Sequence, residues 1–194
     1  MKTLSIDFAS HDGHIACIEG DRTIAIAHVA RVNDTDMIAL IDGVLKDAGW
    51  KKQDIERIAC NVGPGGFTSV RGGVAFANAL ADQLHVPLAG YHGSALALVR
   101  ASADLWTHST RQDQLFVLGR TWTEPTLVSL ENVSKAIAPG TTVTGDLLDA
   151  HRAIFVAKGA VFPSLASLES VLPSFLDGVA YGKDLLVPWY GRGI

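Results

Sequence analysis

The chain has 194 residues, of which 48% are hydrophobic and 19% are charged, and its net charge is −4. This composition is ordinary for a packed globular protein, and the length suits one large domain or two small ones. Because no lysine or arginine cluster extends beyond Lys51-Lys52, a protein that holds nucleic acid by itself is excluded. No apolar run reaches the ~18 to 20 residues of a membrane helix, so we expect a cytoplasmic protein without membrane contact.

The first half of the sequence predicts the element order βββαβα. Alternating apolar residues and intervening turn residues indicate strands at residues 3–8, 14–19 and 23–30. A helix follows, capped by Asn33, Asp34 or Thr35 and stopped by Gly49, with apolar residues recurring at spacings of three and four. Residues 58–62 then form a fully apolar strand, and residues 70–84 a second helix.

The second half carries weaker signals, which still fit an α/β unit of ordinary domain size. A short strand at residues 88–90 and a helix at residues 94–103 come first. Further strands are expected at residues 115–118, 126–130, 141–144 and 153–157, and further helices at residues 131–138, 164–176 and 179–186.

A glycine-rich loop, Gly63-Pro64-Gly65-Gly66, connects the fourth strand to the second helix. Such a loop presents free backbone N–H groups beside a helix N-terminus, where an anion or the polar backbone of a partner can bind. Neither common nucleotide fingerprint is present, because no lysine lies between Lys52 and Lys135 and because Thr68 or Ser69 stands where a third glycine is needed. The loop therefore indicates a binding place without naming a reaction.

The helix that follows this loop is apolar nearly all round. Gly73, Ala77 and Ala81 form a row of small residues at spacing four, and such a helix needs cover on two sides. The second cover is either the other half of the chain or a different subunit. Arg71 opposes the helix dipole in the first turn, so we expect it to have a carboxylate or carbonyl partner, the alternative being a solvated arginine.

The sequence offers no cofactor or metal site. Cys17 and Cys60 both lie within predicted strands without a Cys-x-x-Cys pair, which indicates buried free thiols. His11 and His14 are three residues apart in a turn-like segment, but no third ligand of suitable spacing is near.

Several stretches resemble the TsaB (YeaZ) family. Leu4-Ser5-Ile6-Asp7-Phe8-Ala9-Ser10 is similar to the family's opening Leu-x-Ile-Asp-Thr-Ala. The run from Gly63 to Arg71 is similar to its signature Gly-Pro-Gly-Ser-Phe-Thr-Gly-Leu-Arg, with Gly66 and Ser69 as departures. Residues 87–97 follow the family's next strand and helix. Asn33-Asp34-Thr35 stands where the family commonly has His-Ser-Glu, so the resemblance is to a divergent member.

This resemblance implies an α/β fold of the ASKHA superfamily, with two βββαβα-type subdomains at residues 1–98 and 99–194, the second degenerate. It also implies a non-catalytic subunit that pairs with a TsaD-like catalytic subunit in the synthesis of threonylcarbamoyladenosine in tRNA. A TsaE-like ATPase and a homodimer are further implied partners, with tRNA reached only through the complex. The apolar helix after the glycine-rich loop then supplies the expected partner interface. Its residues are Phe67, Val70, Arg71, Val74, Ala77 and Ala81.

An ASKHA-type ATP-dependent phosphotransferase is the alternative, since Asp7 ends the first strand where that superfamily keeps a metal-associated aspartate. However, bulky Phe8 follows Asp7, and the second half lacks an Asp-x-Gly loop. Phosphoryl transfer depends on positioning and on stabilising phosphate charge, so a chain without these loops has little to catalyse with. A TsaD-like metal subunit would need paired helical histidines, and none of His85, His92, His108 and His151 has a partner four residues away.

Overall fold

The computed structural model describes residues 1–10, 13–29, 36–110 and 113–191. They divide into two compact units. The first unit comprises Met1–Gly93 together with Leu168–Tyr190, and the second is built mainly from Ser94–Ser167. The expected cap at residues 33–35 lies outside the described residues, as does His11.

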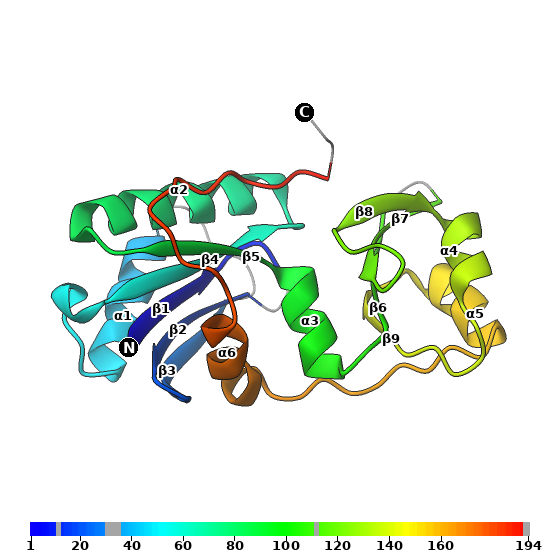
Figure 1. The fold of residues 1–194 in the computed structure, drawn as a ribbon, viewed down its shortest axis with the longest axis horizontal. Helices are drawn as coiled ribbons and strands as arrows, with labels where there is room; N and C mark the ends of the chain where they lie inside the picture. The colour runs from blue at the N-terminus through cyan, green and yellow to red at the C-terminus, as the bar shows by residue number, and fades with distance from the viewer. Residues whose placement is uncertain (11–12, 30–35, 111–112, 192–194) are drawn as a thin grey trace. The chain divides into compact units, whose positions relative to one another are not determined.

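The first unit is built on a five-stranded sheet with the strand order β3-β2-β1-β4-β5 (Figure 1). Its central strand β1 pairs with β2 in antiparallel and with β4 in parallel orientation, and β4 pairs with β5 in parallel. The strands are β1 Lys2–Asp7, β2 Gly13–Glu19, β3 Arg22–Val29, β4 Arg57–Gly63 and β5 Leu88–His92.

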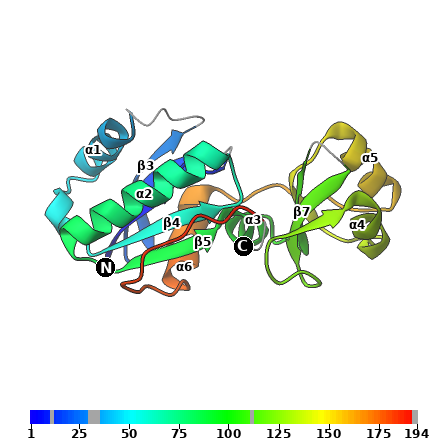
Figure 2. The same ribbon diagram turned by 90° about the horizontal axis from the view of Figure 1, so that it is seen from above.

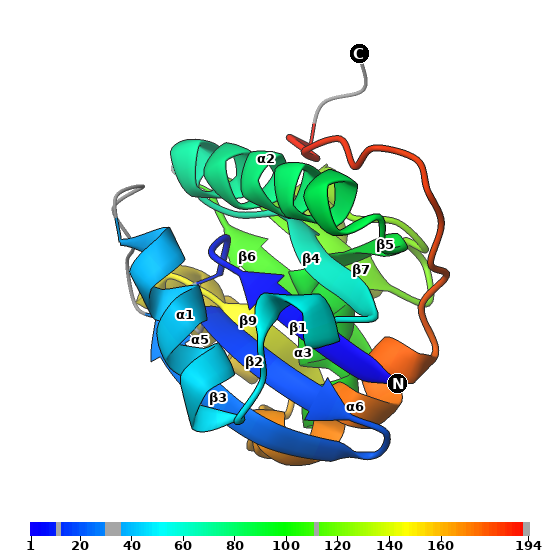
Figure 3. The ribbon, with the colours of Figure 1, turned by 90° about the vertical axis from the view of Figure 1, so that its left-hand side faces the viewer.

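Helices cover both faces of this sheet, as Figure 3 shows. On one face lie α1 (Met37–Asp47) and α2 (Phe67–Leu84). Because successive strand residues point to opposite faces, Leu4 and Ile6 of β1 join the hydrophobic core beneath these helices. A short 3₁₀ helix, η1 (Lys52–Asp54), leads into β4.

The opposite face of the sheet carries α6 (Leu168–Asp177). The hydroxyl groups of Ser5 and Tyr91 are 3.5 Å apart there, and the Tyr91 ring meets Phe175 of α6 edge-on at 5.4 Å. Arg57 ties the end of α6 to the sheet, donating to the Thr3 hydroxyl at 2.7 Å and lying 3.4 Å from the Asp177 carboxylate. Residues 168–190 thus pack with the first sheet, which differs from the expected boundary at residue 98.

The second unit repeats the order βββαβα on a smaller scale. Its four-stranded sheet has the order β8-β7-β6-β9, and α4 and α5 lie on one side of it (Figure 2). Leu115, Val133 and Phe155 join sheet and helices in one apolar core. The elements are α3 Gly93–Ala101, β6 Leu105–Ser109, β7 Gln114–Gly119, β8 Thr126–Ser129, α4 Leu130–Ala136, β9 Val143–Asp146 and α5 Asp149–Ala157.

The elements predicted in the first half of the chain are confirmed with small shifts of their ends. Three differences fall in the weaker second half. Strand β6 was not predicted. Residues 153–157, predicted as a strand, belong to helix α5, and residues 179–186, predicted as a helix, are not helical.

Candidate protein-interaction site around the glycine-rich loop

Helix α2 begins directly after the glycine-rich loop, with Gly66 as its N-cap. It ends at His85, whose left-handed backbone (φ 55°) closes the helix before Pro87. Among the residues expected at a partner interface, four lie in the hydrophobic core against the chain's own sheet: Val70, Val74, Ala77 and Ala81. Their spacing of three and four places them on the helix face that covers the sheet, so they are not available to a partner.

The other two expected interface residues, Phe67 and Arg71, lie on the surface. Phe67 is 61% exposed, and the Arg71 guanidinium carbon lies 5.1 Å from the centre of its ring. Arg71 therefore has an aromatic partner in this structure, where a carboxylate or carbonyl was expected. Such cation–π contacts contribute about 0.5–1 kcal/mol at exposed sites. Further along α2, Ala75 and Ala79 are also exposed, and they form its outer stripe.

The glycine-rich loop is enclosed by two other segments of the first unit. A Cβ atom on Gly65 would collide with the carbonyl of Ala9, in the turn after β1. A Cβ atom on Gly63, which has a φ of 119°, would lie 2.7 Å from the carbonyl oxygen of Trp189. Glycine is required at both positions because other backbone approaches this closely. The loop is thereby packed on both sides.

Asn61, in strand β4 directly before the loop, fixes the loop by hydrogen bonds. Its side chain is 2% exposed, and its Oδ1 atom accepts the backbone N–H groups of Gly63 at 2.9 Å and of Gly93 at 3.0 Å. The loop carbonyl of Gly63 in turn lies 2.9 Å from Nδ1 of His92. The end of β4 and the end of β5 are thus fixed to each other through one buried amide and one imidazole.

The carboxylate of Asp7 is occupied by its own turn. Its Oδ1 atom accepts the backbone N–H groups of Ala9 at 2.8 Å and of Ser10 at 3.1 Å, while Oδ2 accepts the Ser10 hydroxyl at 2.6 Å. Asp7 is buried, and the described residues contain no group of three or more potential metal ligands. In this arrangement Asp7 stabilises a turn that packs on the glycine-rich loop.

The C-terminal segment of residues 182–190, which we call the strap, completes the site. It begins with two backbone hydrogen bonds between Gly182 and Leu88, and it continues with a reciprocal pair between the Asn78 amide and the Leu186 backbone at 3.0 and 2.9 Å. Near its end the N–H of Trp189 donates to the carbonyl of Val62 at 2.8 Å. The strap therefore runs from the edge of β5, along α2, to the glycine-rich loop.

The last described part of the strap extends the exposed surface of α2. The ring of Tyr190 lies 5.1 Å from that of Phe67, and Tyr190 is 43% exposed. These terminal residues were not predicted to contact α2. No local pattern shows that they reach α2, because the contact spans more than a hundred residues.

Burial keeps the ionisable side chains of Tyr91 and Cys60, next to the site, in their protonated forms. Desolvation, followed by the charge of Asp7, raises the pKa of Tyr91 well above its ordinary value, and the same two causes raise the pKa of the Cys60 thiol. Both cysteines are free and buried, as expected. None of these groups is a reactive nucleophile at neutral pH.

Comparisons with known proteins give partial sequence matches. A family model described as TsaD, tRNA N6-adenosine threonylcarbamoyltransferase, matches residues 27–113. The tRNA threonylcarbamoyladenosine biosynthesis protein TsaB of Bacillus subtilis (strain 168) is 31% identical over 90 residues, which are 45% of this chain and 39% of that protein. The match thus spans about two fifths of the length of the curated relative.

Two crystal structures from Pseudomonas aeruginosa share the fold over nearly the whole chain. A protein described as similar to peptidase YEAZ has a TM-score of 0.73 and 18% identity, covering 98% of this chain and 99% of its own. YeaZ has a TM-score of 0.65 and 17% identity, covering 97% and 99%. The sequence match in the first half and the shared fold over both units agree with each other. The sequence match thus covers less than half of the chain, whereas the fold shared with the two solved structures covers nearly all of it.

Proposed function

We propose that this chain is a non-catalytic partner subunit in the cytoplasmic synthesis of threonylcarbamoyladenosine in tRNA. It would bind a TsaD-like catalytic subunit and contact tRNA only through that complex. The names of the matching family model and of the Bacillus subtilis relative support the pathway. The structural observation that supports the non-catalytic role is the packing of other backbone segments against both sides of the glycine-rich loop.

A phosphotransferase of this fold needs space and charge for phosphates at the carboxyl ends of β1 and β4. Here the turn after β1 packs against Gly65, and the Asp7 carboxylate already accepts three hydrogen bonds from that turn. Phe8 of the same turn packs against Gly73 of α2. Because these contacts fill the place of a phosphate, the geometry supports a rigid protein-binding element over the alternative of ATP-dependent phosphoryl transfer.

The surface available to a partner is the outer side of α2. It combines the exposed alanines Ala75 and Ala79 with the aromatic and cationic groups of Phe67, Arg71 and Tyr190. Small residues allow a partner helix to approach closely, while aromatic and arginine side chains dominate the binding energy of protein interfaces. We propose this surface, in place of the buried stripe of α2, as the contact for the TsaD-like subunit.

Co-purification with the TsaD-like subunit of the source organism tests the proposal. Ala79→Glu should abolish the complex, because a charged side chain then projects from the contact surface, while the variant remains folded by circular dichroism. Ala77→Glu is unsuitable, since Ala77 is fully buried and a charge there unfolds the protein. The matched control is Ala153→Glu on exposed α5, which should leave the complex intact.

Survival of the complex in the Ala79→Glu variant would show that the contact lies elsewhere. Sedimentation of the isolated chain shows whether it forms a homodimer through the same surface. Adding a TsaE-like ATPase to the complex shows whether a third subunit binds. Calorimetry with ATP and magnesium decides the alternative, because tight binding together with phosphate release would establish a phosphotransferase.

A further inference from the structure

A serine, a histidine and an aspartate meet in the second unit. Ser109 is the last residue of β6, His151 is the third residue of α5, and Asp113 directly precedes β7. The Oγ atom of Ser109 lies 2.9 Å from Nδ1 of His151, and Nε2 of the same ring lies 3.9 Å from the Asp113 carboxylate. One imidazole thus stands between a hydroxyl and a carboxylate. Serine hydrolases use this order of groups, with the roles of the two ring nitrogens exchanged.

The elements of the second unit explain why these three side chains meet. β6 and β7 pair in antiparallel orientation with Ser109 opposite Leu115, so Asp113 lies at the same end of the sheet as Ser109. Phe155 of α5 packs in the core of the unit, and His151 lies one helical turn before it on the same buried face. That face brings His151 to the end of β6, where the residue is only 6% exposed.

The hydrogen bonds around Ser109 direct its proton toward the imidazole. The backbone N–H of Leu148, the N-cap of α5, donates to the Ser109 Oγ atom at 3.0 Å. With one lone pair of the hydroxyl occupied, its O–H group donates to Nδ1 of His151. The Asp113 carboxylate accepts only, so it favours the tautomer with the proton on Nε2 and the lone pair on Nδ1. In this arrangement His151 is a base for the Ser109 hydroxyl.

Small molecules can reach this hydroxyl from the surface. Ser109 is partly exposed, and Leu148 beside it is 54% exposed, which gives an apolar surface next to the nucleophile. The first N–H groups of a helix have no acceptor within that helix. A short acyl group on Leu148 would therefore place its carbonyl oxygen near the positive end of α5, which favours the oxyanion formed during acyl transfer.

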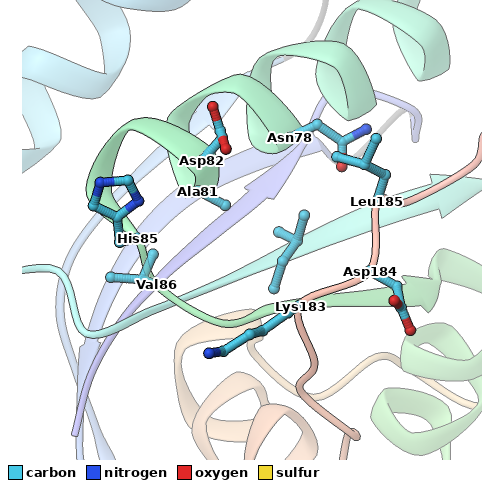
Figure 4. Close-up of a pocket in the computed structure, with 9 residues that line it drawn as sticks. Asn78, Ala81, Asp82, His85, Val86, Lys183, Asp184 and Leu185 are labelled. Atoms are coloured by element: carbon cyan, nitrogen blue, oxygen red, sulfur yellow. The ribbon is translucent and has the colours of Figure 1, made fainter.

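The pocket beside the C-terminal half of α2 offers no such pair (Figure 4). Its volume is about 220 Å³, but the described residues that line it include no serine, threonine, tyrosine or cysteine. The pocket therefore has no side-chain hydroxyl or thiol, whereas the pair in the second unit holds a hydroxyl against a base.

We propose that Ser109 is a nucleophile that accepts a short acyl group from an activated ester or thioester, with His151 as its general base and Asp113 as a positioning residue. The Ser109 oxygen bonds to the acyl carbon while the bond from that carbon to the leaving alcohol or thiol breaks. The hydroxyl proton passes to Nδ1 of His151 and then to the leaving group. Water next attacks the acyl-serine, gives one proton to His151, and releases the carboxylic acid as that proton returns to Ser109. This activity belongs to the second unit and does not depend on the partner-subunit role.

Hydrolysis of p-nitrophenyl acetate by the full chain tests the activity, and labelling with a fluorophosphonate followed by peptide mass spectrometry locates the nucleophile. We expect the label on Ser109. Ser109→Ala and His151→Gln should each lower the rate of hydrolysis at least about tenfold. The matched control is Ser174→Ala on α6, an exposed serine whose hydroxyl donates to the carbonyl of Val171, and it should leave the rate unchanged.

Ser109→Cys separates a base from a merely structural histidine. Cys17 and Cys60 are buried, so iodoacetamide reacts at position 109. Alkylation should be at least about tenfold faster than in a chain that also carries His151→Gln, because the imidazole takes the thiol proton. Thermal unfolding verifies that each variant is folded. The inference is overturned if Ser109 carries no label, if Ser109→Ala hydrolyses the ester like the wild-type chain, or if loss of the imidazole does not slow alkylation.

Discussion

Asn61→Ala should destabilise the first unit strongly, because one buried amide holds two ends of the sheet. Its Oδ1 atom accepts N–H groups from Gly63 and Gly93, and the site around Gly63 is fully buried. Leaving a buried donor without a partner costs about 1–3 kcal/mol. The Gly93 donor is only partly buried, so water replaces part of its lost bond. The expected loss in the free energy of unfolding is therefore about 2–4 kcal/mol.

Urea unfolding followed by circular dichroism measures this loss as a lower midpoint at an unchanged slope. The matched control is Asn132→Ala on exposed α4, where the free energy of unfolding should change by no more than about 0.5 kcal/mol. If Asn61→Ala also lies within that margin, the two hydrogen bonds do not hold the loop. A folded Asn61→Ala chain should also bind the TsaD-like subunit more weakly, because the start of α2 follows the loop.

Three further outcomes follow from other contacts. Arg57→Met should speed hydrogen exchange in α6 and the strap, since it removes the contact with Asp177. Unchanged exchange would show that Arg57 does not hold α6 on the sheet. Thr142→Val should raise the pKa of Asp104 in an NMR titration, because the hydroxyl and N–H of Thr142 lower it in the folded chain. Burial raises the pKa of Cys17 from 9.0 to about 12. The unfolded chain therefore loses this proton first, and the free energy of unfolding should fall as pH rises above about 9, less steeply in Cys17→Ala.

The first unit was predictable because its local signals agree with its tertiary structure. Strands β1 to β3 alternate with clear turns between them, and α1 has a regular apolar stripe. The orientation of α2 was also readable in principle. Val70, Val74, Ala77 and Ala81 follow the spacing of a core stripe, whereas the opposite face carries Ala75 and Ala79. The expected interface included this stripe because a helix that is apolar nearly all round does not indicate which of its faces packs on its own sheet.

The second unit shows where local patterns fail. Ala153-Ile154-Phe155-Val156-Ala157 is a short apolar run rich in β-branched residues, and such a run fits a strand as well as a buried turn of helix. In the structure, His151 and Phe155 are buried while the three residues between them are exposed, and this spacing of four is the pattern of a helix. The prediction for the strap was wrong for another reason. Its conformation depends on Leu88, Asn78 and Val62, all far away in sequence, and no window of the sequence contains both partners.

The strap connects the edge of β5 to the glycine-rich loop. Its start is hydrogen-bonded to Leu88, its middle is fixed to α2 by Asn78, and its end lies over the glycine-rich loop through Trp189 and against Phe67 through Tyr190. The strap therefore shapes part of the proposed partner surface. Because Asn78 clamps the strap between these points, displacement of one end requires breaking two hydrogen bonds before the other end moves. Removal of the Asn78 side chain should therefore let movement at Gly182 reach Tyr190 and loosen the proposed partner surface.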